Sequence, residues 1–291
     1  MAAGACAAGF AALGPVDDDS REMYSRWLAA GRNAGMDYME RYCDVRDNPG
    51  LLLEGARTIM CVAFAYRTPD SPRHPLFADY ALGRDYHEVL RKRLAPVAAM
   101  MEESVPGSKT RICVDTAPLR ERYWAARAGV GNIAKNNFLI VPGVGAAVFL
   151  AEILWTAAVR PSESMLGRSC SDCGACRKAC PGGALGADGQ IDASRCLSYL
   201  TIEHRGELPE RLDLAGKRIY GCDICRDVCP ECRAADVFVP EEFLPSAELL
   251  SLDIDAVRAM EQPEFSRIFS HSAVKRAKLA GLRRNALRRP L

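Results

Sequence analysis

The sequence predicts an α/β protein made of three successive parts. Strand-like and helix-like patterns alternate over residues 1–160, which is typical of a layered α/β domain. Of the 13 cysteines only four precede residue 170, so the others crowd into a module that we place at residues 161–240. Helical patterning returns over residues 241–291 and predicts a short helical C-terminal segment.

The first part holds two helix-like and two strand-like segments. Residues 21–44 are amphipathic and predict a helix that ends near the Asn-Pro-Gly turn at 48–50. Residues 57–66 form a compact β-type run, and residues 85–105 predict a second helix. Residues 111–117 predict another strand, which ends in a carboxylate. Strands that alternate with helices in this way indicate a layered arrangement.

The composition indicates a folded protein that works away from membranes. With 49% hydrophobic and 26% charged residues the chain can bury a sizeable core, and its net charge of +1 excludes a polycation. The most apolar run, residues 138–155, is interrupted by Pro142, Gly143 and Gly145, so it predicts two buried strands around a turn and no membrane span. A signal peptide begins with basic side chains, and the first residues of this sequence carry none. We therefore expect a cytoplasmic protein, in whose reducing surroundings clustered cysteines bind metal.

The first cysteine motif has the spacing of a bacterial ferredoxin. Cys170, Cys173, Cys176 and Cys180 follow C-x2-C-x2-C-x3-C, and Pro181 comes next. This spacing binds a [4Fe–4S] cluster, and the fourth cysteine serves the other cluster in two-cluster proteins. The motif therefore predicts a ferredoxin-like module with a second cluster.

The second motif lies at residues 221–230, and its three cysteines match the last three positions of the first. The position that corresponds to Cys170 is Ile219, which cannot ligate iron. We expect Cys196 to supply the missing thiolate, with Cys232 as a competing donor. The predicted ligand sets are therefore crossed: Cys170, Cys173, Cys176 and Cys229 for cluster one, and Cys180, Cys196, Cys222 and Cys225 for cluster two.

A pair of structural zinc sites is the alternative interpretation of these cysteines. Zinc prefers separated CxxC pairs and does not require a three-cysteine run with a trailing Cys-Pro. Two [4Fe–4S] clusters are favoured because the two motifs agree and the crossed assignment completes both ligand sets. The remaining cysteines are interpreted as core or surface thiols: Cys6, Cys43, Cys61 and Cys113.

Several longer stretches resemble the epoxyqueuosine reductase family. They are NPGLLLEGARTI (48–59), DYALGRDYHEVLRKRL (79–94), VDTAPLRERYWAARAGVGNIAKNNFLI (114–140) and RCLSYLTIEHRGELPERL (195–212). The ferredoxin motifs alone would match many families, whereas the VDTAP and RAGVGNIAKN stretches are specific. The resemblance runs from GFAALG near the start to LRRNAL near the end.

This resemblance implies an enzyme that reduces the epoxide of epoxyqueuosine, in the wobble position of tRNA, to the alkene of queuosine. The family uses cobalamin and two [4Fe–4S] clusters, so residues 1–160 are expected to form a cobalamin-binding catalytic domain. Cob(I)alamin can supply a strongly reducing centre, and low-potential clusters can feed it one electron at a time. The expected partners are tRNA bearing epoxyqueuosine and an external low-potential electron donor, and no membrane is expected.

The reductive opening of an epoxide also needs a proton for the departing oxygen. Asp115 in VDTAP matches the family's acid and follows an apolar strand that would end at a pocket. Partial desolvation can raise the pKa of an aspartate enough to keep it protonated near neutral pH. A turn or helix-capping role ahead of Pro118 is the alternative. A polar cluster in a matching stretch carries no assigned role: Tyr80, Asp85, Tyr86 and His87.

The resemblance further implies a set of cobalamin contacts. Arg46 matches a cofactor-contacting arginine, Lys135 could pair with phosphate or amide groups of the cofactor, and Ser198 lies close to Cys196, where cluster two would approach the corrin. Solvated surface positions, a helix cap and core packing are the alternative roles of these side chains. The expected contacts are Arg46, Lys135, Asn136, Leu139, Leu150 and Ser198.

The departures from the family pattern concern RNA binding more than the redox core. Many members continue into a helical-repeat extension, and this sequence is interpreted as a short form that ends at Leu291. Glu231 and Cys232 stand where tryptophan and asparagine are common, and Asn132 stands where an aromatic residue is common. The basic stretch 274–291 could neutralise RNA phosphates in place of the extension, or form a solvated helix face.

Two other functions stay open at this point. One is a ferredoxin-like electron-transfer protein without substrate chemistry, although such a carrier needs little more than the cysteine-rich module. The other is a cobalamin-dependent reductase of another small molecule, such as a halogenated compound.

Overall fold

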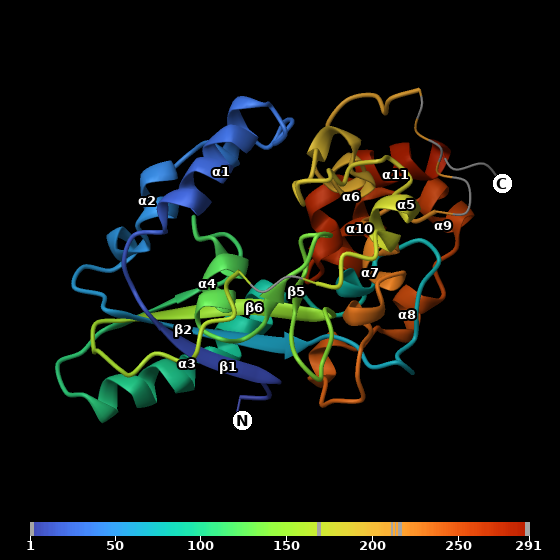
Figure 1. Ribbon diagram of the computed structural model, residues 1–291. Coiled ribbons are helices and arrows are strands. Elements are labelled where there is room, and N and C mark those ends of the chain that lie inside the picture. Colours follow the sequence, from blue (N-terminus) through green and yellow to red (C-terminus); the bar gives the residue numbers. More distant parts are fainter. Residues whose placement is uncertain (1–2, 168–169, 211, 213, 215–216, 289–291) are drawn as a thin grey trace.

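A four-stranded antiparallel sheet forms the centre of the N-terminal part (Figure 1). In this computed structural model, which describes residues 3–167, 170–210, 212, 214 and 217–288, the strand order is β1-β2-β6-β3. The strands are β1 (Ala7–Ala12), β2 (Thr58–Ala65), β3 (Thr110–Cys113) and β6 (Val148–Trp155). The strands expected at 57–66 and 111–117 are thus confirmed.

Helices cover both faces of this sheet, so the layered α/β architecture is confirmed. Helix α3 (Tyr86–Ser104) packs its apolar side chains, among them Leu90 and Leu94, against Val62 and the other side chains of that face. The opposite face carries α4 (Glu121–Arg127), whose Trp124 is fully buried beside the sheet. Because the central strands are covered on both sides, their sequences are nearly continuous runs of apolar residues.

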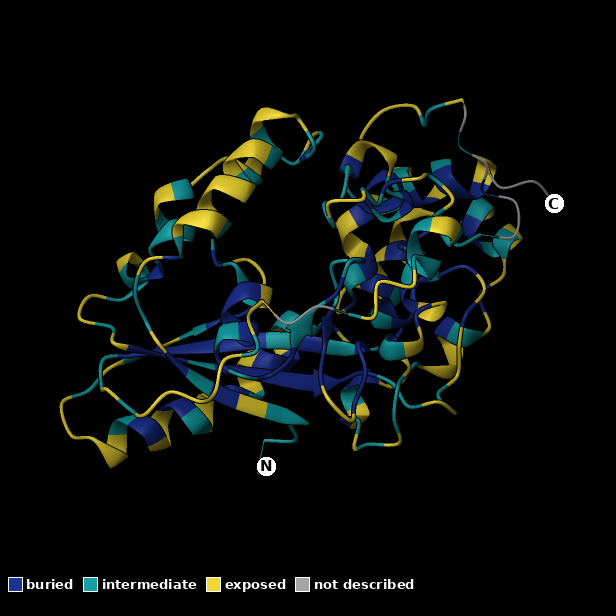
Figure 2. Cartoon of the chain, viewed as in Figure 1, coloured by how far each residue is buried: buried dark blue, intermediate teal, exposed yellow. Residues whose placement is uncertain are grey.

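The first hundred residues also contain an arm that the sequence predicted only in part. The single helix expected over residues 21–44 is wrong: α1 (Asp18–Ala29) and α2 (Cys43–Asp47) are separate, with short 3-10 helices η1 (Asp37–Met39) and η2 (Pro49–Leu52). The helix ends because Gly31 and Ala34 adopt positive φ angles of 65° and 51°. Helix α1 buries no residue and stands out as an exposed element in Figure 2.

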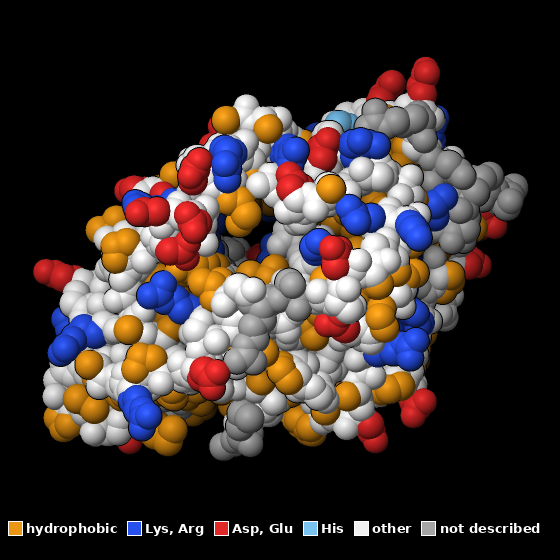
Figure 3. All heavy atoms as spheres, in the orientation of Figure 1, with side chains coloured by type: hydrophobic (Ala, Val, Ile, Leu, Met, Phe, Trp, Pro, Cys, Tyr) orange, Lys and Arg blue, Asp and Glu red, His pale blue; other side chains and the backbone are white. Residues whose placement is uncertain are grey.

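This arm joins α4 to the cysteine-rich part. At its base, Nη1 of Arg120 donates to the backbone oxygen of Ser20 at 2.8 Å. At its tip, Nε1 of Trp27 donates to the backbone oxygen of Ile191 at 2.7 Å, and the amide of Gly35 donates to the Tyr199 hydroxyl at 2.8 Å. Being anchored at both ends, the arm encloses a hollow that is visible between α1 and the C-terminal half of the molecule (Figure 3).

The run 138–155 forms two strands around a turn, as expected. They pair differently, however, because β5 (Leu139–Ile140) joins β4 (Asn132–Ile133) in a two-stranded sheet while β6 lies in the main sheet. The turn contains Gly145, at φ 95°, where an added Cβ would lie 2.0 Å from the backbone oxygen of Arg233. Only glycine allows this close approach of the turn to the cysteine-rich part.

The rest of the chain consists of short helices. The cysteine-rich part contains α5 (Ala175–Ala179), η4 (Ala193–Arg195), α6 (Leu197–Ile202), α7 (Ile224–Asp227) and η5 (Pro230–Cys232). The C-terminal segment is helical, as expected. It contains η6 (Glu241–Phe243), α8 (Ala247–Leu250), α9 (Ile254–Ala259), α10 (Gln262–Phe269), η7 (Ala273–Ala277) and α11 (Lys278–Arg288). The short helix η3 (Asp79–Ala81) precedes α3.

The C-terminal helices share one hydrophobic core with earlier segments. Phe269 and Leu282 pack in the same cluster as Phe77, which follows β2, and Ile219, which precedes the second cysteine motif. The three-part division therefore stays a prediction, since the last part has no core of its own in this cluster. No helix among the described residues combines the length and the apolarity of a bilayer-spanning segment.

The basic C-terminal stretch is a docked helix in which most cations already have partners. Arg284 donates to the backbone oxygens of Leu200, His204 and Gly206, which lie in or just after α6. Arg276 forms an ion pair with Glu203 at 2.8 Å. Arg284 thus binds an orphan carbonyl group in the last turn of α6 and two carbonyl groups just after it, and Arg276 binds a carboxylate, so both arginines contribute to folding before they can contribute to RNA binding. Arg289 lies outside the described residues.

Candidate functional site

Four cysteines line one pocket in the cysteine-rich part. Cys170 and Cys173 precede α5, Cys176 lies in its first turn, and Cys229 follows α7. Gly174 takes a φ of 73° and so lets the chain reverse between Cys173 and the helix. Cys173 is exposed, whereas Cys229 is 8% exposed. The structure therefore brings together the four residues expected to hold cluster one.

The other predicted ligands form a second group beside the first. Burial raises the pKa of Cys222 to about 11, with further contributions from the nearby thiols of Cys196 and Cys180. Burial likewise raises the pKa of Cys225, and the thiols of Cys222, Cys196 and Cys180 add to the effect. Cys176 also acts on Cys225, so the two groups are neighbours. Because metal ligation replaces the proton of a thiol, a bound cluster would offset the cost of these thiolates.

The competing donor Cys232 lies with the first group. It is 2% exposed, and its sulfur accepts a hydrogen bond from Nδ2 of Asn136 at 3.4 Å. Its thiol also forms a hydrogen bond with the thiol of Cys229. No three His, Cys, Asp or Glu side chains in the described ranges converge closely enough to chelate a single ion. The four cysteines of the first group stand around a pocket instead, as the separate corners of a cube require.

Asp115 lies two residues after β3, within electrostatic range of Tyr38 on the arm and of Arg276 on η7. It adopts a positive φ of 52°, and its side chain is 52% exposed. Its amide donates to Oε1 of Glu121, the first residue of α4, at 2.6 Å. Its Oδ2 lies 3.0 Å from Nε2 of His87 in the first turn of α3. The expected position at the end of a strand is confirmed, since Asp115 follows β3 and faces α3 and α4.

The expectation that the carboxyl of Asp115 has a raised pKa is wrong. Desolvation by the surrounding walls acts to raise this pKa, but the hydrogen bond and charge of His87 outweigh it and lower the pKa overall. Desolvation acts to lower the pKa of His87 in turn, and its bonds to Asp115 and Asp85 raise it to about 9. The sequence motif identified Asp115, but nothing in the sequence indicated that His87 would form a hydrogen bond with it.

Two further carboxyl groups lie behind Asp115 on the α4 side of the sheet. Burial and the nearby Asp115 charge raise the pKa of Glu121 to about 8. Glu152 in the middle of β6 is fully buried, and neither of its oxygens has a hydrogen-bond partner among the residues that the structure describes. Its cross-strand neighbours are Cys61 on β2 and Cys113 on β3, so these two predicted core thiols flank it directly.

Charged groups from both halves of the molecule lie around Tyr38. Tyr38 of the arm interacts with the charges of Glu203, Arg276, Asp115 and Arg46, and burial raises its pKa to about 12. The Arg276 guanidinium lies 5.7 Å from the centre of the Tyr38 ring. Figure 3 shows the opening between the arm and the helices of the C-terminal half, with apolar and charged side chains gathered around it.

The predicted cofactor contacts are spread around this region. Arg46 donates from Nη2 to the backbone oxygen of Tyr38 at 3.2 Å, and its buried Nε has no partner in the described residues. Ser198 is partly buried in the first turn of α6, and Leu150 is partly buried on β6. Leu139 is 3% exposed and belongs to the core beneath α4.

Lys135 and Asn136 lie at the first cysteine group. Nζ of Lys135 pairs with Asp172 at 2.6 Å, and both line its pocket. Asn136 is 2% exposed and donates from Nδ2 to the backbone oxygen of Cys225 at 2.9 Å. This loop therefore ties the α/β part to the cysteine motifs, a role that sequence reasoning missed.

The comparisons with known proteins agree with this arrangement. Residues 46–116 match the family model described as Epoxyqueuosine reductase QueG, DUF1730, and residues 169–231 match a 4Fe-4S double cluster binding domain. The epoxyqueuosine reductase of Cyclobacterium marinum is 37% identical over 89% of this chain and 84% of its own length. The chain belongs to the epoxyqueuosine reductase family. The family's enzymes from Gloeobacter violaceus and Escherichia coli are 37% and 34% identical, over 96% and 92% of this chain and 89% and 74% of theirs.

Solved epoxyqueuosine reductases have the same fold. One selenomethionine-labelled crystal structure is 30% identical and superposes with a TM-score of 0.88, covering 98% of this chain and 77% of the other. A second, solved with an epoxyqueuosine-modified tRNA-Tyr stem loop, gives a TM-score of 0.87 at 30% identity and the same coverage. A Bacillus subtilis structure, with its aspartate-bearing catalytic loop swung out of the active site, gives 0.86 at 29% identity, again with that coverage. The expected family and fold are thus confirmed, and the cysteine-rich part is a 4Fe-4S domain.

Proposed function

We propose that this chain is an epoxyqueuosine reductase that converts epoxyqueuosine in tRNA to queuosine. The observation that carries the proposal is the placement of Asp115, which hydrogen-bonds with His87 and lies within electrostatic range of Tyr38 on the arm and Arg276 on η7. The reaction adds two electrons and two protons to the epoxide and releases an alkene and water. The site must therefore supply protons next to a source of electrons.

The electron path of the proposal consists of two [4Fe–4S] clusters. Cluster one takes Cys170, Cys173, Cys176 and Cys229, and cluster two takes Cys180, Cys196, Cys222 and Cys225. The pocket shared by the first set and the mutual effect of the second set on their pKa values support this assignment. The exposure of Cys173 supports cluster one as the entry point for an external low-potential donor.

We propose that the hollow holds cobalamin, which would supply a strongly reducing cobalt centre. The chemical support is Arg46, whose buried Nε has no partner in the described part of the chain and whose charge suits the phosphate or amide groups of the cofactor. Ser198 and Leu150 are partly buried and can contribute a polar and an apolar contact. Lys135, Asn136 and Leu139 are engaged in the protein itself, so we assign them the indirect role of fixing the walls.

Within this scheme Asp115 is the acid that protonates the departing oxygen. Its exposure at the hollow allows contact with a substrate, and its positive φ and its bond to Glu121 fix its direction. The tRNA would present its wobble nucleotide from outside, where Tyr38 is 40% exposed at the rim and can stack on a base. We further propose a reducing cytoplasm as the compartment, because the clusters need unoxidised thiolates.

The test is turnover of an epoxyqueuosine-containing anticodon stem loop by the full chain. The protein is purified anaerobically, loaded with iron, sulfide and cobalamin, and reduced chemically. Mass spectrometry of the RNA should show the loss of one oxygen. The Asp115→Asn variant should lose this activity and keep its iron and cobalamin, and the control Asp70→Asn, at an exposed position after β2, should retain it.

Each other function predicts a different result. A simple electron carrier would bind iron but no corrinoid and would not convert the RNA. A cobalamin-dependent reductase of another small molecule would bind both cofactors and leave the RNA unchanged. Either result would contradict the proposed function.

A further inference from the structure

His87 lies between two carboxylates and forms a hydrogen bond with each of them. Its Nε2 lies 3.0 Å from Oδ2 of Asp115, and its Nδ1 lies 2.7 Å from Oδ1 of Asp85. The Asp85 side chain is 4% exposed, and its second oxygen, Oδ2, lies 2.7 Å from Nζ of Lys275 on η7. A chain of four groups therefore runs from a surface lysine through Asp85 and His87 to Asp115.

The chemistry of imidazole determines how many protons this chain holds. A neutral histidine donates from one ring nitrogen and presents a lone pair at the other. Two ionised carboxylates, each at hydrogen-bond distance from a different nitrogen, can both be satisfied only by the doubly protonated ring. The alternative is that the proton sits on one carboxyl group, and in either case the three groups share one extra proton. Lys275 favours an ionised Asp85, which places this proton between His87 and Asp115.

On the basis of the proposed function, we propose that His87 is the positioning residue that supplies protons to Asp115. The Nε2–H bond of His87 breaks, the O–H bond of Asp115 forms, and Asp115 then gives this proton to the departing oxygen of the substrate. The neutral imidazole left behind takes a proton from water, which reaches its 21% exposed side chain. Two such deliveries provide the two protons of the reduction, and the electrons come from the clusters.

The surroundings of His87 support this role on every side. The Tyr86 ring stacks on the imidazole at 4.2 Å between centres, which fixes the plane of the ring. Asp85 belongs to the same element, Asp115 follows β3, and Glu121 on α4 adds a third carboxyl group within electrostatic range. The cations act on the two aspartates: Lys275 on Asp85 and Arg276 on Asp115. The negative groups that face the ring directly favour its protonated form.

The kinetic test uses His87→Gln, because a glutamine amide can still donate to Asp115 but cannot transfer a proton. Single turnovers of pre-reduced enzyme with the RNA stem loop remove any limit from electron supply. The variant should bind RNA and cobalamin normally and react roughly 10²-fold more slowly, the usual contribution of general acid–base catalysis. The matched control is His271→Gln, since His271 also bonds with a carboxylate, Glu88, but is 62% exposed and outside the chain of four groups.

The pH dependence separates proton supply from a merely structural role. The rate of the wild-type enzyme should fall as the pH rises past about 9, where His87 loses its proton. The His87→Gln variant should lack this decline. A variant with the wild-type rate and the wild-type profile would overturn the proposal.

A second readout does not depend on turnover. The chain has four histidines, so nitrogen-15 NMR of the labelled full chain can follow each ring. The His87 ring should stay doubly protonated at pH 8, and its pKa should fall in Asp115→Asn. A His87 ring that titrates near the ordinary histidine value of about 6.5 would disprove proton storage even if the enzyme is active. If instead the ring titrates as expected but no RNA is reduced, the proposed function fails and the proton chain stands.

Discussion

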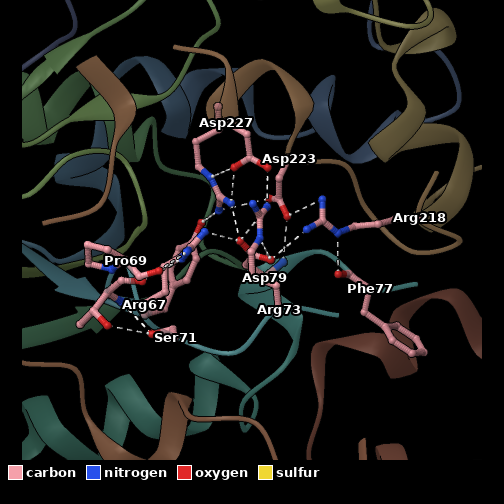
Figure 4. A network of polar contacts seen from close by, with 12 residues as sticks. Arg67, Pro69, Ser71, Arg73, Phe77, Asp79, Arg218, Asp223 and Asp227 are labelled. Carbon is pink, nitrogen blue, oxygen red and sulfur yellow. Dashed lines mark hydrogen bonds and ion pairs between the residues drawn. The ribbon is translucent and has the colours of Figure 1, made fainter. Parts of the chain in front are cut away.

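Nη2 of Arg226 lies 2.5 Å from Oδ2 of Asp79, and the two side chains are 3% and 2% exposed. Asp79 precedes α3 in the α/β part, whereas Arg226 lies on α7 between two cysteines of the second motif. Figure 4 shows Asp79 at the centre of a network of polar contacts that also includes Arg73 and Arg218. The members besides Asp79 and Arg226 are Arg67, Arg73, Arg218, Asp223 and Asp227. The ion pairs between these buried groups join the two halves of the molecule.

The first prediction concerns the stability of this junction. Removal of one partner of a buried pair leaves an uncompensated charge and costs about 3–5 kcal/mol, so Asp79→Ala should lower the free energy of unfolding by about that amount. Asp227→Asn is the matched control, because its side chain is 27% exposed and water can replace the lost contacts. Denaturant unfolding measured by circular dichroism checks both. Equal stability of the two variants would show that the network contributes little.

The second prediction separates Cys196 from Cys232 as the ligand of cluster two. Cys196→Ala should lose about half of the bound iron and sulfide, because cluster two would keep only three thiolates. Cys232→Ala should retain the full iron content, since Cys232 lies beside Cys229 and Asn136. Iron and sulfide analysis, with electron paramagnetic resonance of the reduced protein, distinguishes the variants. Iron loss in Cys232→Ala alone would reverse the assignment.

Much of the fold could be predicted from local patterns. The strands β2 and β3, the helix α3 and the spacing of the cysteines depend on residues close together in the sequence, and all were correctly placed. The arm was not, because an amphipathic pattern does not show where positive φ angles at Gly31 and Ala34 interrupt a helix. Residue patterns describe one segment at a time, so the bridge from α4 to Ile191 had no signal in them.

The same limit explains what was missed at the site. Asp115 and the cysteines stand in recognisable motifs, whereas the role of His87 depends on a contact between residues 28 positions apart. Its position two residues after the helix cap Asp85 was visible in the sequence, but the carboxylate that it faces was not. The direction of the Asp115 pKa was predicted wrongly for this reason, since desolvation was considered without the neighbouring imidazole.

The third prediction follows from the buried carboxyl group of Glu152. Burial raises its pKa well above the ordinary value, so the folded protein keeps a proton that the unfolded chain loses near pH 4 to 5. Above that pH the folded state binds more protons, and the free energy of unfolding falls as the pH rises, by up to about 1.4 kcal/mol per pH unit. Glu152→Gln stays neutral at every pH and should remove this decline.

Unfolding of the Glu152→Gln variant should therefore be compared with that of the wild type at pH 6 and pH 8. The stability gained by the substitution should be larger at pH 8. Glu54→Gln is the control, because Glu54 is exposed before β2 and its replacement should leave the pH dependence unchanged. A gain that does not grow with pH would mean that Glu152 is ionised in the folded protein.

The last prediction tests whether the hollow binds cobalamin through Arg46. The Nε atom of Arg46 is buried and has no hydrogen-bond partner within the described ranges, while Nη2 donates to the backbone oxygen of Tyr38, so the side chain is oriented and one of its donors is left over. A hydrogen bond to a charged group contributes about 1.5–3 kcal/mol, so Arg46→Ala should weaken cobalamin binding by roughly 10- to 100-fold. The nearby Arg41→Ala, at an exposed position of the same arm, should leave the affinity unchanged. Titration of the protein with cobalamin, followed by the absorption spectrum of the corrin, measures this without turnover. An unchanged affinity for cobalamin in Arg46→Ala would show that the cofactor does not contact Arg46. Equal losses of affinity in both variants would indicate a general effect of charge.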